Sequence, residues 1–293
     1  SLDYPLKNSL QDTLGGQQDA ILTIFDPNFD SLLYSSYFGG LKDDAGYGLA
    51  IDPLTNDILF CGGTESNDLS FNTKSHKSNY SGGSCDGFVV RLAFSLDSIK
   101  GASLIGHSKY DQAYFIQCGF DGEVYLTGQA INADNSFPVY NTNYSDSSGT
   151  QFIMEFSSNL DSVIWSGVFG SGDYWPNLSP SAFLVDNCQR IYFSGWGGNS
   201  NFHGSTDGLK TSKDAFQDQT DGSDFYLVVF EKNMDSIIYA TFYGGPRSSE
   251  HVDGGTSRFN KNGIVYQSIC GGCGGNSDLP TTPNAWSRLN RGI

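Results

Sequence analysis

A short phrase that recurs four times restricts this chain to a repeat architecture. The clearest copy begins at Asp30 and reads Asp-Ser-Leu-Leu-Tyr-Ser-Ser-Tyr-Phe-Gly-Gly, and the same frame returns at nearly constant intervals. Each copy opens with Asp-Ser, continues with alternating apolar residues and reaches a glycine nine positions after the aspartate, a pattern typical of a strand bounded by two turns. The copies begin at Asp30, Asp97, Asp161 and Asp235, and their glycines are Gly39, Gly106, Gly170 and Gly244. The chain is therefore predicted to be a repeat protein.

Each repeat contains four segments with strand patterns. The first is a continuous apolar run, the second is the Asp-Ser phrase, and the third and fourth are separated by a tight turn such as Asn262-Gly263. With 36 glycines, 21 phenylalanines and 16 tyrosines, the composition favours short aromatic strands over helices. Four antiparallel strands repeated radially form the blade of a β-propeller. We therefore predict an all-β propeller with four blades in this stretch, part of a larger propeller of about seven blades.

The repeats give the expected boundaries of the blades. Residues 1–18 are the end of a preceding repeat, and residues 19–85, 86–149, 150–223 and 224–293 are repeats one to four, the last with the connector to a further repeat. We expect the first strand of each repeat, Ala20 to Phe25 in repeat one, to be the innermost. Because the chain begins and ends in the same phase of the repeat, we also expect that it does not close a ring by itself.

Charge and composition exclude several partners. The chain has 32 acidic against 16 basic residues and a net charge of −16, which repels nucleic acids and anionic lipid surfaces. No apolar run approaches the roughly 18 residues that span a membrane, so we expect no membrane insertion. Six cysteines in an acidic, tyrosine-rich chain favour an extracellular location.

Nearly the whole chain resembles a known family of repeats, and a narrower resemblance rests on Gly195 to Trp286. Leu33 to Gly40, Gly48 to Asp52 and the strand ending at Gly62 resemble the SBBP family of bacterial β-propeller repeats, and Asp278 to Trp286 resembles the connector of that repeat. The last repeat, with His251 to Phe259 and Tyr266 to Gly275, resembles a narrower group. That group is the large cell-surface proteins of type IX secretion and gliding motility, in which such propellers precede PKD domains.

The resemblance implies a function without catalysis. It brings no catalytic residues, and it implies a scaffold or adhesion module whose partners are other proteins, surface glycans and the flanking domains of a longer chain. The alternative is an extracellular carbohydrate-active enzyme or a glycan-binding propeller. The sequence gives this alternative little support, because it contains neither Gly-x-Ser-x-Gly nor His-Glu-x-x-His and its four histidines are scattered.

The sharpest local motif is Cys270-x-x-Cys273. Folding the last hairpin about Lys261 places His251 opposite Gly271, which gathers His251, Asp253 and the two cysteines at one edge of a blade. These four residues are a possible metal site of the zinc type, but a second Cys-x-x-Cys is absent. The favoured interpretation is a disulfide or a thiol pair that stabilises a glycine-rich loop, and redox chemistry is a third.

Two further sets of residues are weaker candidates for ligand binding. Trp175 and Trp196 are candidates for a platform on which sugar rings stack, but the favoured interpretation is that these aromatics cover the core beneath the long connectors. Asp43, Asp44 and the loop from Asp52 to Asp57 offer oxygen ligands of the kind that calcium takes, but they do not match an EF-hand. No cofactor is certain, and calcium is the one considered.

Overall fold

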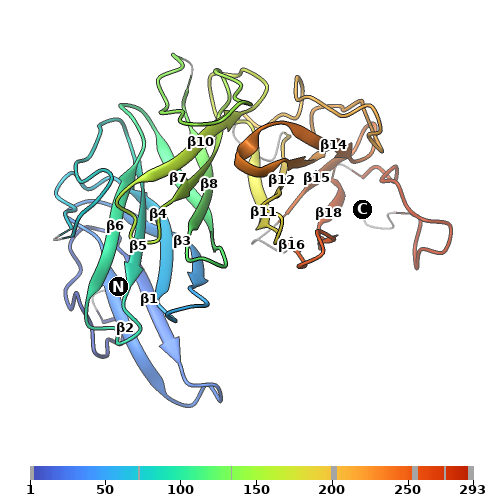
Figure 1. The fold of residues 1–293 in the computed structure, drawn as a ribbon. Coiled ribbons are helices and arrows are strands. Elements are labelled where there is room, and N and C mark those ends of the chain that lie inside the picture. Colours follow the sequence, from blue (N-terminus) through green and yellow to red (C-terminus); the bar gives the residue numbers. More distant parts are fainter. Residues whose placement is uncertain are drawn as a thin grey trace. The chain divides into compact units, whose positions relative to one another are not determined.

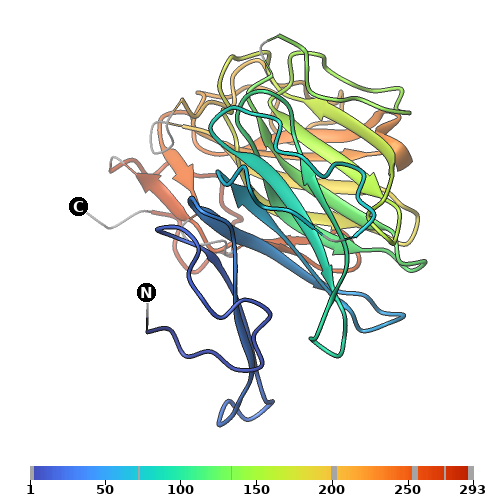
Figure 2. The same cartoon turned by 90° about the vertical axis from the view of Figure 1, so that its left-hand side faces the viewer.

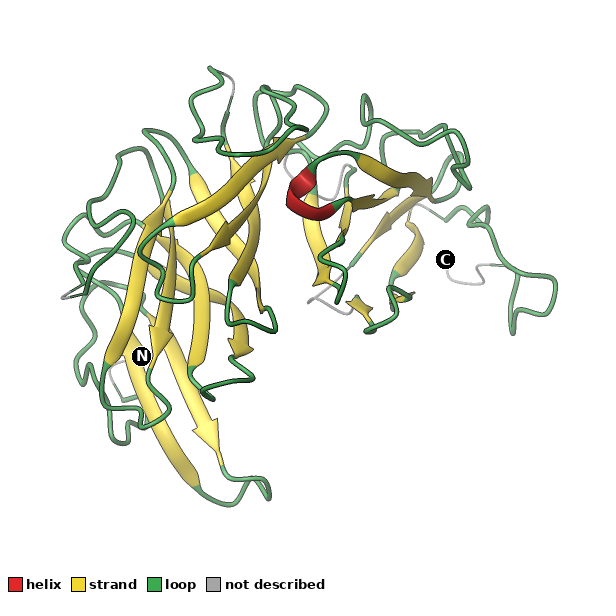
Figure 3. Cartoon of the chain, in the orientation of Figure 1, coloured by secondary structure: helices red, strands yellow, loops and turns green. Residues whose placement is uncertain are grey.

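The computed structural model describes residues 3–71, 73–132, 134–198, 203–252, 257–273 and 275–289. The chain forms two compact units (Figure 1). Unit 1 contains residues 1–131, 136–140 and 153–166, and unit 2 contains residues 132–135, 141–152 and 167–293. Strands dominate both, and in the described part of the chain the one helix is a short 3₁₀ turn, Lys232–Met234, drawn red in Figure 3. The predicted all-β class is confirmed.

Three four-stranded sheets make up most of the described chain, and their strands follow the order of the sequence. Every strand pair whose register is resolved within them is antiparallel, as the propeller prediction requires. The first sheet is β3 (Asp44–Ile51), β4 (Ile58–Thr64), β5 (Asp86–Leu92) and β6 (Ile99–Ile105). The second is β7 (Asp111–Cys118), β8 (Val124–Ala130), β9 (Gln151–Phe156) and β10 (Val163–Phe169). The third is β11 (Ser179–Val185), β12 (Ile191–Trp196), β13 (Phe225–Phe230) and β14 (Ile237–Tyr243).

The sheets are offset by half a repeat from the predicted blades. Each one combines the third and fourth strands of one repeat with the first and second strands of the next, so the blade boundaries drawn from the repeats are wrong. The prediction that Ala20 to Phe25 and its equivalents are innermost is also wrong, because β5, β9 and β13 each lie between two neighbours. The reason is that the long connector returns the chain to the same sheet, while the short link after the repeated phrase leads into the next one.

Two-stranded sheets precede and follow the three four-stranded sheets in the sequence. In unit 1, β1 (Ala20–Phe25) pairs with β2 (Leu32–Phe38), and this hairpin is the long blue ribbon of Figures 1 and 2. In unit 2, β15 (Ser249–His251) pairs with β18 (Cys270–Cys273), and β16 (Arg258–Phe259) pairs with β17 (Val265–Tyr266). By repeat position, β1 and β2 are the third and fourth strands of a sheet, and the other four segments form the first two.

The long connectors protect the free edge of each sheet. Lys7 forms a bridge with Ser35 of β2, and Tyr140 forms one with Ser166 of β10. The backbone of Lys77 accepts a bond from Leu104 of β6 in the same way. An unpaired edge strand invites association with other strands, and a covering segment removes that hazard.

The turn that opens the repeated phrase has one geometry in all four repeats. In the first copy, the Asp26 amide donates to the Ser31 carbonyl and the Phe29 amide donates to the Asp26 carbonyl. The same two bonds close the other three turns. The residue equivalent to Phe29 has a positive φ in each turn although it is a large apolar residue, which is rare for a side chain with a Cβ. These residues are Phe29, Leu96, Leu160 and Met234, with φ of 61°, 63°, 60° and 56°.

Candidate functional sites

The glycine that ends the repeated phrase lies against a pair of buried acidic side chains. A Cβ atom on Gly39 would lie 2.6 Å from Asp44 Oδ2 and 2.8 Å from Asp19 Cγ. Asp19 comes directly before β1 and Asp44 begins β3, and their side chains are 7% and 1% exposed. Because no side chain fits between these carboxyl groups and the backbone, glycine is required at this position.

The same arrangement recurs in two further repeats. Asp111 is buried beside Gly106 and interacts electrostatically with the buried Asp86, and Asp224 and Glu250 are buried beside Gly244. One member of each pair precedes or begins the first strand of its repeat, and the other lies at or beside the start of the third strand. We call these three groups the carboxyl pairs: Asp19–Asp44, Asp86–Asp111 and Asp224–Glu250. Of these six residues, only Asp44 is among the calcium ligands predicted from the sequence, together with Asp43.

Backbone amides hold the carboxyl pairs in place. Gly40 N donates to Asp44 Oδ2 over 2.8 Å, His107 N donates to Asp111 Oδ2 over 2.7 Å, and Gly245 N donates to Glu250 Oε2 over 3.3 Å. Burial is the main cause that raises the pKa of Asp44, Asp86, Asp111, Asp224 and Glu250. The pKa is about 6 for Asp86 and Asp224 and about 7 for Glu250, and those of Asp44 and Asp111 are also raised.

The repeat-three positions hold a neutral pair. Thr150 lies beside Gly170, and Thr150 and Asn177 are as buried as the acids. The Thr150 hydroxyl donates to Asn177 Oδ1 over 3.4 Å. Asn177 Nδ2 donates in turn to Ser171 Oγ over 2.6 Å. The position therefore needs a hydrogen-bonded polar pair but does not need charge.

The predicted calcium ligands do not assemble. Asp43 is exposed, whereas the neighbouring Asp44 is buried in its carboxyl pair. Among the described residues, no group of three His, Cys, Asp or Glu side chains is arranged to hold a metal. The calcium prediction from Asp43 and Asp44 together therefore finds no support in the geometry.

The acidic loop after β3 takes part in an ion network instead. Arg91 of β5 forms ion pairs with Asp52 and, at 3.4 Å, with Asp57, and Arg91 is 4% exposed. Lys100 of β6 donates to Asp57 over 2.8 Å. Burial by itself raises the pKa of Asp52 and Asp57, but bonds from Arg91 and Lys100 outweigh it, and the pKa of each aspartate is lowered. These carboxylates serve the fold and are not available to a metal.

The cysteine motif is described only in part. His251 pairs with Cys270, one position from the predicted partner Gly271, and Ser249 pairs with Cys273. Asp253 and the side chain of Cys273 lie outside the described residues, so the disulfide, metal and redox interpretations stay predictions.

The two predicted tryptophans have different neighbours. Trp175 is 41% exposed and stacks on His203, with ring centroids 5.4 Å apart and planes 6° apart. The Tyr174 ring packs edge-on against Trp175, with centroids 5.0 Å apart. Trp196 is half-buried and lies 5.6 Å from the His251 ring. Trp175 therefore belongs to an exposed aromatic group of its own, and Trp196 belongs to the edge of β12.

A tyrosine group on β3 and β7 was not predicted. Tyr47 is 50% exposed and stacks on Tyr114, with centroids 5.1 Å apart, and Gln112 Nε2 donates to the Tyr47 hydroxyl over 3.1 Å. The Tyr110 and Tyr114 hydroxyls lie 2.9 Å apart. Tyr47 and Tyr114 occupy third strands of successive repeats, but the tyrosines are not at a position shared by all four repeats, and so the repeat pattern gave no signal.

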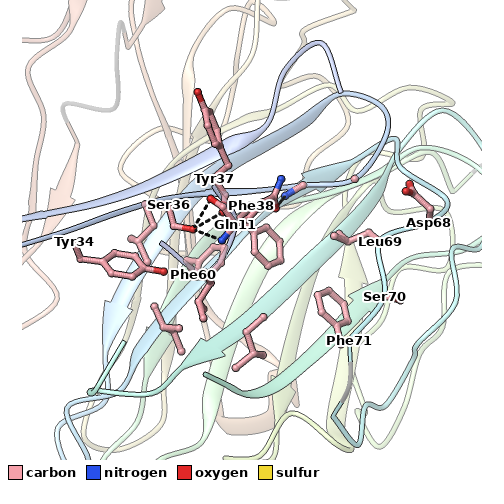
Figure 4. A pocket seen from close by; sticks show the side chains of 16 residues that line it. Gln11, Tyr34, Ser36, Tyr37, Phe38, Phe60, Asp68, Leu69, Ser70 and Phe71 are labelled. Atoms are coloured by element: carbon pink, nitrogen blue, oxygen red, sulfur yellow. Dashed lines mark hydrogen bonds between the residues drawn. The ribbon is translucent and has the colours of Figure 1, made fainter. Parts of the chain in front are cut away.

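Unit 1 contains an apolar cavity of about 270 Å³. It lies between the β1–β2 hairpin and the first sheet, and Figure 4 shows Phe38, Phe60 and Phe71 around it, with Gln11 bonded to Ser36 at one wall. Phe38 packs edge-on against Phe60 at 4.8 Å. On its wall Gln11 is bonded to Ser36 and Gly39, and Asp68 accepts a bond from the Leu41 amide. Polar groups engaged in this way fit a packing space between sheets better than a catalytic pocket.

One solved propeller structure is similar to this chain at low sequence identity. The chain is similar to the solved structure titled "Structure of Dos1 propeller", with a TM-score of 0.40 and 11% sequence identity. The four-stranded antiparallel sheets of this chain resemble the blades of a β-propeller. The alignment covers 84% of this chain and 46% of that one, so this chain spans about half the length of its structural neighbour, and the likeness concerns the fold alone.

The sequence comparisons add no family. No protein-family model matches the chain, and no curated protein matches it. Within the described residues, helices are too short and too polar to cross a membrane.

Proposed function

We propose that this stretch is a non-catalytic propeller module of a large secreted, cell-surface protein, which acts as a scaffold or adhesion module and takes part in surface attachment or gliding motility. Its sequence resemblance to SBBP repeats and to type IX-secreted surface proteins supports this assignment. The structural observation that carries it is an apolar face of the β1–β2 hairpin formed by Ile21, Phe25 and Phe29, which we call the hairpin face.

The hairpin face is exposed although its equivalents are buried. Ile21, Phe25 and Phe29 are 41%, 49% and 80% exposed, and the rings of Phe25 and Phe29 lie 6.2 Å apart. The register of β1 with β2 matches that of β5 with β6 and of β13 with β14, which identifies the equivalents. In repeats three and four the equivalents are no more than 2% exposed: Phe152, Phe156 and Leu160, and Tyr226, Phe230 and Met234.

The equivalent faces show what covers such a surface. The Leu160 carbonyl accepts a bond from the His76 amide of the preceding connector, and Gly101 of β6 lies beside Leu160. Met234 packs in the same way against Gly167 of β10, and its carbonyl accepts a bond from Thr142. A neighbouring blade of the same repeat is therefore the partner that fits the hairpin face. A module that presents such a face works within a larger array of blades.

The distribution of polar residues argues against catalysis. The polar positions that recur are the carboxyl pairs and the turn Asp-Ser, and each has a structural explanation in the fold. The exposed aromatic groups differ from repeat to repeat. A variable surface on a constant frame suits recognition better than chemistry.

Deletion of the stretch from its parent protein tests the proposal. We expect attachment, surface assembly or motility to fall while secretion of the remaining domains continues. The double variant Phe25→Asp and Phe29→Asp in the parent protein should lower the amount of folded surface protein, whereas Phe120→Asp should not, because Phe120 is equally exposed (67%) but lies in a turn outside this face. Normal attachment after deletion would contradict the proposal.

The second candidate is a glycan-binding propeller. It is favoured by the stacked pairs Trp175 with His203 and Tyr47 with Tyr114, since exposed aromatic faces beside amide and hydroxyl groups suit sugar rings. A glycan array with the isolated chain, repeated with Tyr47→Ala and Trp175→Ala, separates glycan binding from a purely structural role.

A further inference from the structure

The carboxyl pairs bring like charges together in the interior. All six side chains are at most 7% exposed, and among the described residues none of them forms an ion pair with lysine or arginine. Two carboxylates in close proximity away from water repel one another strongly, because the interior screens charge poorly. A buried pair of this kind needs a positive charge to offset the repulsion, and a proton on one of the two carboxyl groups is the simplest source of that charge.

Each pair also has one oxygen without a hydrogen-bond partner. These atoms are Asp44 Oδ1, Asp86 Oδ1 and Asp224 Oδ1. An ionised carboxylate only accepts hydrogen bonds, whereas a protonated carboxyl group can also donate one. Such a group directed at its carboxylate neighbour would relieve both the repulsion and the unpaired oxygen.

Repeat three provides a natural comparison. The Thr150 hydroxyl donates to the Asn177 side-chain oxygen at the equivalent position, so a neutral donor and an acceptor occupy the place of the two acids. A protonated carboxyl group and a carboxylate would form the same donor and acceptor combination. The threonine and asparagine need no proton from solvent to do so.

The groups around the pairs supply little positive charge. Lys77 and His107 are the basic residues that face one of them, Asp86–Asp111, and His107 Nδ1 lies 2.9 Å from Asp111. Arg247, near Asp224–Glu250, is paired with Asp278 at 3.2 Å. Among the residues that the structure describes, the other titratable groups facing the three pairs are acidic or neutral: Asp68, Glu65, Tyr80, Cys85, Asp221, Tyr243 and Asp278.

We propose that each carboxyl pair is a proton-binding site that takes up one proton when the protein folds. Mild acid would then stabilise the contacts between successive sheets at Gly39, Gly106 and Gly244. The raised pKa values agree with this geometry. A carboxyl group whose pKa is higher in the folded state contributes stability that is fully present below the unfolded pKa, near 4, and is lost as the pH rises through the folded value. The thermal midpoint should therefore fall between pH 5 and pH 8.

The Asp224–Glu250 pair offers the sharpest test. The variant Asp224→Asn with Glu250→Gln keeps the shapes and removes both titrating groups. Its control is Asp214→Asn with Asp218→Asn, two exposed acids whose loss changes the net charge equally. We expect the thermal midpoint of the wild type and of the control to fall by several degrees from pH 5.5 to pH 8, and the fall to be clearly smaller in the Asn/Gln variant.

Infrared spectroscopy of the wild-type chain gives a second measurement if the variant does not fold. A protonated buried carboxyl group has a carbonyl band distinct from that of a carboxylate, and we expect this band at pH 6, where exposed acids are ionised, and its loss near pH 8. Absence of the band at pH 6 would overturn the proposal. Stoichiometric calcium binding at pH 8 that raises the midpoint of the wild type but not of the Asn/Gln variant would also overturn it, because a metal ion would then fill the site.

Discussion

Asp224 and Glu250 meet at Gly244, where a Cβ atom would lie 2.6 Å from Glu250 Oε2 and would overlap Asp224 Oδ1. The two acids are separated by a strand, a turn and a second strand in the sequence, and the repeated phrase ends at the glycine between them. The relationship explains why this glycine recurs in every repeat: it is the contact point between the end of one sheet and the start of the next.

The first prediction concerns this glycine. Gly39→Ala should destabilise the fold by about 1 to 3 kcal/mol, because the added methyl group must displace Asp19 or Asp44 in a packed interior. Gly46→Ala in β3 is the matched control, since a Cβ there meets only Ala20 at 3.5 Å, an ordinary contact. Urea unfolding of both variants decides the matter. Equal free energies of unfolding for the two variants would contradict the prediction, because Asp19 and Asp44 would then move aside at little cost.

The second prediction concerns the ion network of the first sheet. Arg91→Met should lower the free energy of unfolding by about 3 to 5 kcal/mol, because Asp52 and Asp57 lose a buried partner. Lys100→Met should cost about 1 kcal/mol or less, since the Lys100 side chain is 49% exposed. Denaturant titration at neutral pH measures both. A small effect of Arg91→Met would show that water reaches the two aspartates.

The third prediction is an acid limit to stability. The pKa values of Asp52 and Asp57 are lowered, so their contribution is present above the unfolded value near 4 and is lost as the pH falls through the folded values. Above that range the carboxyl pairs have the opposite effect, because their contribution to stability is lost as the pH rises. Stability should therefore pass through a maximum near pH 5, and the acid limb should be weaker in Arg91→Met. Thermal unfolding across pH 2 to 8 provides the measurement.

Sequence patterns predicted the strands well because strand formation is local. Alternating apolar residues and turn glycines mark segments such as Leu32–Phe38 and Ile58–Thr64, and the structure confirms them. The grouping of these strands into sheets could not be predicted from the same local patterns. It depends on whether the long connector or the short link changes sheet, and both choices use the same strands.

The candidate sites were harder to predict because they join distant residues. An acid stands at the start of the first strand or directly before it, at Asp19, Asp86 and Asp224, and this signal is visible in the repeats. The role of this acid could not be inferred from it alone, because the second acid of the pair lies a whole hairpin further along the sequence. In contrast, the hairpin face had no sequence signal at all, because Ile21 and Phe25 look like any buried strand residues until the structure shows that nothing described covers them.

The fourth prediction concerns Cys270 and Cys273. Replacing both with serine should lower the thermal midpoint by a few degrees and leave ligand binding unchanged, since a local link in a loop acts mainly on local order. Mass spectrometry of the intact protein with and without reductant tests for the disulfide. Stoichiometric zinc in purified protein, lost in the double variant, would favour the metal interpretation in which His251 takes part.

The last prediction is that the isolated chain turns over no common glycan, peptide or ester substrate. Hydrolysis needs an acid, a base or a nucleophile in one accessible place. The acids that lie close together here are buried beside glycines of the frame, and those of the first sheet are neutralised by Arg91 and Lys100. A substrate screen at pH 5 to 8 provides the measurement, with the Tyr47→Ala variant as a control for binding. Robust hydrolysis abolished by a single substitution of an exposed Asp or Glu would establish an enzyme and overturn the scaffold assignment.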